Sequence, residues 1–202
     1  GKIDWNINDK HQFTLRYNYI DAFDDNLSRS ANFFRFGNNA YKFTNKQSSL
    51  VAELRSNFNS SFSNNLILGY SSIKDSRDTA GSPFPQITIL NIGGVSGASA
   101  EFGSQRSSFA NELDQTIFEV TDNFKWNIGK NTFTLGTHNE FFSFRNLFIN
   151  NLNGRWDFNS VADYLNNVPA RVRATYSLIP GESRPEAKFS AAQLGFYAQG
   201  ES

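Results

Sequence analysis

The chain has 202 residues, enough for one sizeable domain, but only 39% of them are hydrophobic, which is low for a soluble protein. Its 19 basic and 19 acidic residues cancel, which argues against nucleic-acid binding through a basic surface. Cysteine is absent, which excludes disulfides and thiolate metal sites, and no apolar run is long enough for a transmembrane helix. Aromatic residues nevertheless reach 15%, with 21 phenylalanines. This combination suits a sheet that needs apolar side chains at only every second position.

Alternating apolar and polar residues predict seven strands along the chain. They cover residues 2–7, 11–23, 44–59, 64–75, 112–128, 131–149 and 190–199. In the second strand Phe13 and Leu15 fall on one face, while Thr14 and Arg16 fall on the other. In the fifth strand Asp122 interrupts the apolar face, and it is the clearest exception to the alternation.

The connections between these strands alternate in length. Three are brief, polar and suited to hairpins, at residues 8–10, 60–63 and 129–130. The three connections at the opposite end are long, irregular and rich in Gly, Ser, Asn and Pro, at residues 24–43, 76–111 and 150–189. Short turns at one end of the strands and long loops at the other are typical of outer-membrane β-barrels and uncommon in compact soluble domains.

The predicted fold is therefore all-β, a transmembrane antiparallel up-and-down β-barrel with lipid on its apolar face and a lumen on its polar face. A soluble sandwich, in which the apolar face packs on a second sheet, is the alternative. The fifth and sixth strands favour the barrel because they are long enough to cross a bilayer core of ~30 Å. Since bacterial barrels have an even number of strands, at least eight, we expect an incomplete segment of about seven strands from a longer polypeptide.

Three stretches carry a resemblance to a known family: Glu112–Phe144, Gly81–Pro85 and Phe189–Gln199. Together they resemble the barrel of TonB-dependent outer-membrane receptors, especially the Oar-like branch. The resemblance implies a barrel of about 22 strands around an N-terminal plug that contacts the TonB complex and lies outside this chain. It also implies a receptor that binds a ligand at the cell surface and imports it with energy relayed by TonB. The family pattern continues beyond Gln199 with an acidic residue and Trp, so Gly200–Ser202 is not expected to be regular strand.

Candidate ligand-binding residues lie in the third long loop, where arginines stand near aromatic residues that can anchor a ligand. They are Arg155, Trp156, Tyr164, Arg171, Arg173 and Tyr176. A surface lipoprotein, a peptide or a protein is the expected ligand. The alternative is a loop that only packs on its neighbours.

The predicted polar face offers a second set of candidates. His138 and Glu140 share it, and an outer-membrane hydrolase using His138 is one alternative function. We favour a polar network of the wall, and we predict no catalytic residue, metal site or cofactor. A charge ladder on the same face solvates the wall or contacts a plug, and comprises Glu53, Arg55, Glu119 and Lys125.

Aromatic residues flank the short turns and predict a girdle at the membrane surface: Trp5, Phe58, Phe124 and Trp126. A soluble or surface-attached β-domain with an adhesive or structural role remains the other alternative function. The expected location is the outer membrane of a Gram-negative bacterium.

Overall fold

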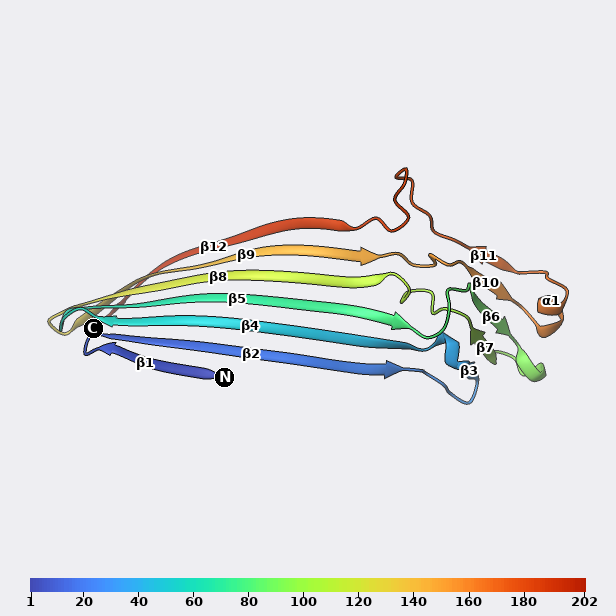
Figure 1. Ribbon diagram of the computed structural model, residues 1–202, viewed down its shortest axis with the longest axis horizontal. Helices are drawn as coiled ribbons and strands as arrows, with labels where there is room; N and C mark the ends of the chain where they lie inside the picture. Colours follow the sequence, from blue (N-terminus) through green and yellow to red (C-terminus); the bar gives the residue numbers. More distant parts are fainter.

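The computed structural model describes residues 1–202 and contains one long antiparallel sheet whose strands pair in chain order (Figure 1). The strands are β1 (Lys2–Asn8), β2 (His11–Asn26), β4 (Tyr41–Asn57), β5 (Phe62–Thr79), β8 (Asn111–Ile128), β9 (Asn131–Phe148) and β12 (Ala187–Glu201). The predicted all-β, up-and-down architecture is confirmed. The sheet is open, with β1 and β12 at its edges. None of the helices has the length and apolar character needed to cross a bilayer.

Polar side chains shape the short turns at one end of this sheet, which we call the turn end. The side chain of Asn8 accepts hydrogen bonds from the backbone N–H groups of Lys10 and His11, at 2.9 and 3.0 Å. Asn59 does the same in the turn before β5. The third turn places Gly129 at φ +61°, a conformation that favours glycine.

The turns advance along the register from one hairpin to the next. The backbone N–H of Asn57 donates to the carbonyl of Lys10, so the first turn lies opposite the end of β4, and the second turn continues beyond it. Phe62, just after the second turn, pairs with Trp126 of β8. The third turn begins at Gly129, three residues beyond Trp126. This advance is about one residue per strand, the stagger that tilted strands need in a barrel wall.

The sheet buries polar residues and exposes apolar ones. Glu53 and Thr14 on the polar face are only 6% and 8% exposed. On the opposite face Leu135, Leu194 and Phe196 are 59%, 63% and 79% exposed. A soluble protein buries its apolar face, so this exposed face is built for lipid rather than water.

The apolar face forms a band of definite height. Towards the turn end it is bounded by the register pair Trp126–Phe133, and towards the other end by the pair Phe118–Phe141. The two aromatic pairs are eight positions apart on β8, roughly 20 Å along the membrane normal for tilted strands. Beyond this band the first charged residue on the same face of β8 is Asp114. The spacing matches the ~25 Å apolar band of outer-membrane barrels.

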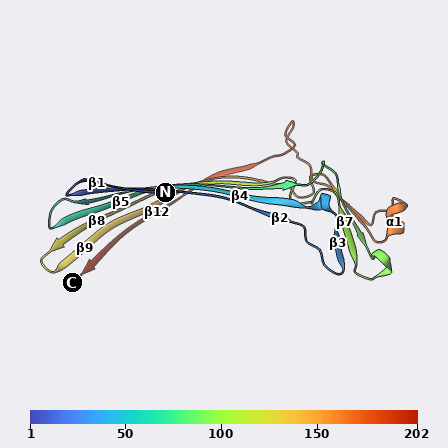
Figure 2. The same cartoon turned by 60° about the horizontal axis from the view of Figure 1, so that its bottom comes forward.

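The three long connections meet at the other end, the loop end, where they build a second sheet, which we call the loop sheet (Figures 1 and 2). Its order is β11-β10-β6-β7-β3. Its elements are β3 (Phe33–Arg35), β6 (Gln86–Leu90), β7 (Ser99–Phe102), β10 (Arg155–Phe158) and β11 (Arg171–Arg173). Two 3-10 turns and one helix accompany it: η1 (Gly37–Asn39), η2 (Ile92–Gly94) and α1 (Val161–Leu165).

The loop sheet corrects the expectation of irregular loops. Its strands have three to five residues, too few for alternation to be recognised. The pairs β3–β7 and β6–β10 are parallel and join different loops, so no hairpin signal precedes them. A small apolar core of Ile87, Ile89 and Phe158 supports the loop sheet, as in a water-soluble domain.

Several strands of the long sheet also extend beyond their predicted ends. β5 runs from Phe62 to Thr79. Six residues of the expected loop 24–43 belong to strands, because β2 continues to Asn26 and β4 begins at Tyr41. β12 includes Gly200 and Glu201, which pair with Phe133 and Thr132. The expected break at residues 200–202 is therefore wrong for these two residues, because backbone pairing with β9 holds them in register regardless of side chain.

Candidate functional site

The loop sheet gathers five of the six candidate residues. Arg155 and Trp156 lie on β10, Tyr164 lies on α1, and Arg171 and Arg173 form the two ends of β11. Tyr176 follows β11 in an irregular segment, where it is 77% exposed. No ring contact or side-chain hydrogen bond joins Tyr176 to the other five residues.

Two of the three arginines, Arg155 and Arg173, contact a single carboxylate, that of Asp157. In the β10–β11 register Arg155 faces Arg173, and Asp157 faces Arg171, so all four side chains share one face. Arg155 Nε lies 2.6 Å from one Asp157 oxygen, and an Arg173 nitrogen lies 3.8 Å from the other. Arg171 has no carboxylate within 4.0 Å. The cluster therefore has more positive than negative charge and can accept an anionic group.

The cluster opens towards solvent at the edge of the loop sheet. The side chains of Arg155 and Asp157 are 16% and 14% exposed, whereas that of Arg173 is 34% exposed. β11 pairs only with β10, so its outer edge is unpaired. A ligand can therefore reach Arg171 and Arg173 without displacing the buried ion pair.

Trp156 and Tyr164 lie on the opposite, apolar side of the loop sheet. Trp156 packs against the core of Ile87, Ile89 and Phe158. The Tyr164 ring meets the Phe158 ring edge-on at 5.3 Å. Helix α1 is held in place by Ser160, whose side chain accepts a hydrogen bond from the Asp163 backbone. These two aromatic residues thus support the site from behind.

A buried polar network, missed by the sequence analysis, ties two loops together. Glu101 on β7 pairs with Arg35 on β3 at 3.2 Å and accepts hydrogen bonds from Gln86 and Thr88 on β6. Burial of a charge is tolerated when it is paired and hydrogen-bonded in this way. No local pattern marks these residues, because they come from two connections and meet only in the folded sheet.

A second cluster of charged side chains lies at the loop end of the long sheet. Arg145 on β9 contacts Glu112 and Asp114 of β8 at 2.7 and 2.9 Å, and Glu186 at 2.6 Å. Hydrogen bonds from Arg145 and then from Lys188 lower the pKa of Glu186 to about 2. The cluster fixes the chain where the third loop enters β12.

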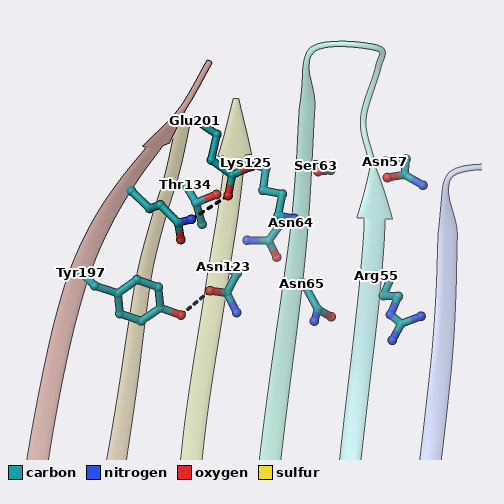
Figure 3. A pocket seen from close by; sticks show the side chains of 11 residues that line it. Arg55, Asn57, Ser63, Asn64, Asn65, Asn123, Lys125, Thr134, Tyr197 and Glu201 are labelled. Atoms are coloured by element: carbon teal, nitrogen blue, oxygen red, sulfur yellow. Dashed lines mark hydrogen bonds between the residues drawn. The ribbon is translucent and has the colours of Figure 1, made fainter. Parts of the chain in front are cut away.

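The polar face of the long sheet holds a cavity of about 570 Å³ near the turn end (Figure 3). It is lined almost entirely by amide, hydroxyl and charged side chains from five strands. Arg55 and Lys125 of the predicted charge ladder lie there, and Tyr197 points across the cavity to donate a hydrogen bond to Asn123. Glu53 lies further along the wall, between Arg55 at 2.8 Å and Arg16 at 3.5 Å. This surface can hydrogen bond with a polar occupant of the lumen.

His138 and Glu140 lie on the same polar face, as predicted. His138 Nδ1 is 2.6 Å from the hydroxyl of Thr121 on β8, and its Nε2 is 3.7 Å from Glu140. The second distance is beyond hydrogen-bond range, so Thr121 is the only side chain that hydrogen bonds with the ring. No group of three or more His, Cys, Asp or Glu side chains is arranged to hold a metal ion.

The chain matches the family described as outer membrane beta barrel domain over residues 1–201. No curated protein and no solved structure matches it. The match covers both the long sheet and the loop sheet. It agrees with the exposed apolar band and the arrangement of short turns and long loops.

Proposed function

We propose a receptor function for this chain, which belongs to the outer membrane beta barrel domain family. It forms part of the wall of an outer-membrane receptor and transporter that binds a ligand at the cell surface. Uptake of the ligand is energised by TonB, through a plug outside this chain. The TonB step rests on the resemblance of Glu112–Phe144 and Phe189–Gln199 to TonB-dependent receptors.

The observation that carries this proposal is the ordered loop sheet. Ordering three long loops costs conformational entropy, and a simple pore has no need of it. Long loops of outer-membrane barrels face the cell exterior, so the loop sheet lies where a ligand first arrives. Its open edge presents Arg171 and Arg173, which suit a carboxylate or another anionic group of a peptide, a protein or a surface lipoprotein.

Binding and uptake are measured separately in cells of the native host that carry the full-length protein. The probe is a pool of fluorescently labelled acidic peptides. Bound fluorescence is measured on ice, and internalised, protease-protected fluorescence is measured at growth temperature. We expect the double variant Arg171→Gln/Arg173→Gln to lose most surface binding, and Lys130→Gln at a periplasmic turn to bind like the wild type.

Deletion of TonB separates the two halves of the proposal. We expect it to leave surface binding intact and abolish internalisation. Internalisation that persists without TonB contradicts the energised step. Binding with no internalisation in any strain favours the adhesive alternative, and peptide cleavage that is lost in His138→Ala favours the hydrolase alternative.

A further inference from the structure

The outward face of β4 and β5 carries a symmetrical set of six polar side chains just beyond the apolar band. Each strand contributes a lysine between two hydroxyl residues, and the strands run side by side (Figure 1). We call this set the lysine patch: Thr44, Lys46 and Ser48 on β4, and Ser72, Lys74 and Ser76 on β5. In the antiparallel register each residue faces its counterpart, so that Lys46 lies directly opposite Lys74.

Two lysines in this relation repel each other, because directly opposite side chains have their Cβ atoms about 5 Å apart. Lys46 has one partial counter-charge, Asp21, at 3.9 Å. Lys74 has no carboxylate within 4.0 Å. Asp114 on β8 lies opposite Lys74 in the register, but its carboxylate forms an ion pair with Arg145 at 2.9 Å. The patch therefore holds two cations, and only Lys46 has a carboxylate within 4.0 Å.

The height of the patch places it at the level of lipid headgroups. The pair Leu50–Tyr70 belongs to the apolar face, and Lys46 lies four positions before Leu50 on β4, towards the loop end. That interval corresponds to about 10 Å of height along a tilted strand. Both lysine side chains are exposed on the lipid-facing side of the wall. Because this is the loop end, the adjoining lipids belong to the outer leaflet.

The donors of the patch suit a phosphate group. A phosphate carries close to two negative charges and three acceptor oxygens, which match two ammonium groups flanked by hydroxyls. Thr44 and Ser76 already hydrogen bond to each other at 2.7 Å, which holds that side of the patch in place. We propose that the lysine patch binds the phosphate of a phosphorylated glycolipid headgroup in the outer leaflet of the outer membrane. This inference does not depend on the proposed receptor function.

The test uses the full-length protein purified in a neutral detergent. Its melting temperature is measured with bisphosphorylated lipid A, with the same lipid after dephosphorylation, and with inorganic phosphate at the same phosphate concentration. The variant Lys46→Gln/Lys74→Gln removes both charges of the patch. The control Lys10→Gln/Lys130→Gln removes two lysines at the opposite, periplasmic end.

We expect bisphosphorylated lipid A to raise the melting temperature of the wild type and of the control, and dephosphorylated lipid to have little effect. The patch variant should bind lipid A roughly tenfold more weakly or worse, and so lose most of the rise. Without lipid it should be at least as stable as the wild type, because the repulsion is gone. If the double variant does not fold, Lys74→Gln alone leaves the Asp21–Lys46 pair intact and should still weaken binding.

An equal rise in the patch variant and the wild type overturns the proposal. The proposal is also overturned if the Lys10→Gln/Lys130→Gln control loses as much of the lipid-induced rise in melting temperature as the patch variant does. That result shows a general effect of charge. An equal rise with inorganic phosphate also overturns it, because the site then recognises a free anion rather than a headgroup.

Discussion

Asp122 on β8 accepts a hydrogen bond from the side-chain amide of Asn64 on β5, at 2.7 Å. The register places Asp122 opposite Leu66, on the lipid-facing side of the wall. Asp122 lies midway along β8 between Trp126 and Phe118, the aromatic residues that bound the apolar band. The structure thus places an ionisable side chain near the middle of the bilayer, where such residues are costly.

Replacement of Asp122 by Leu should stabilise the protein in a bilayer. The carboxyl group gives up water for one amide partner, whereas Leu meets lipid at no such cost. We expect the free energy of unfolding to rise by about 1 kcal/mol, net of the hydrogen bond lost. Urea titration of the full-length protein in phospholipid vesicles measures this, with Glu119→Gln on the polar face as the control. A clear loss of stability in Asp122→Leu indicates that Asp122 does not face lipid.

Replacement of Leu135 by Arg should have the opposite effect. Leu135 on β9 is 59% exposed on the apolar face, close to the level of Asp122. An arginine there should lower the free energy of unfolding by roughly 2–4 kcal/mol. Thr134→Arg is the matched control, because Thr134 precedes Leu135 on the same strand but its side chain lines the cavity on the polar face. Equal effects of the two substitutions contradict the assignment of the faces.

The long sheet could be predicted because its signals are local. Residues such as Phe13 and Leu15 alternate with polar neighbours, and each short turn has polar residues or glycine that stabilise it. Asp122 was recognisable as an exception, but its partner Asn64 is 58 residues away and comes into reach only through the β5–β8 register. Register across a long loop follows from the whole sheet rather than from any segment.

Acid should loosen the entry of the third loop into β12. The pKa of Glu186 is lowered from 4.5 to about 2 by Arg145 and Lys188, so its carboxylate contributes stability above pH 4.5 and loses it as the pH falls towards 2. Amide hydrogen exchange at the start of β12 should therefore accelerate across this interval in the wild type. Glu186→Gln should exchange faster at neutral pH and change less with acid. Because the Glu186 side chain is partly open to solvent, at 23% exposed, high salt should reduce the difference.

The candidate site was only partly predictable. Arg155, Arg171 and Arg173 were recognised as candidate ligand-binding residues by their type, their aromatic neighbours and their place in a long loop. The carboxylate of Asp157, which contacts Arg155 and Arg173, was not recognised, because only the β10–β11 register brings Arg173 to it. The β6–β10 pairing that carries them depends on residues about 70 positions apart, and a four-residue strand gives no period to detect.

Gly103 offers a way to disrupt the loop sheet without touching its charges. It has φ +86°, and a Cβ atom there would clash with the backbone carbonyl of Pro85, which cannot move as a side chain can. Its carbonyl also accepts a hydrogen bond from the buried side chain of Asn39 at 2.9 Å. Gly103→Ala should therefore destabilise the loop sheet by about 2 kcal/mol or more, combining the positive φ with the clash.

Gly97→Ala is the matched control, since Gly97 has φ +79° but open space where the Cβ would lie. It should cost only about 1 kcal/mol. Protease digestion of intact cells should cleave the loops of Gly103→Ala much faster than those of Gly97→Ala, while both proteins remain in the outer membrane. If the arginine cluster binds ligand, Gly103→Ala should also lose surface binding even though Arg171 and Arg173 are still present. Full binding by a Gly103→Ala protein with cleaved loops places the ligand site elsewhere, on the lumen wall.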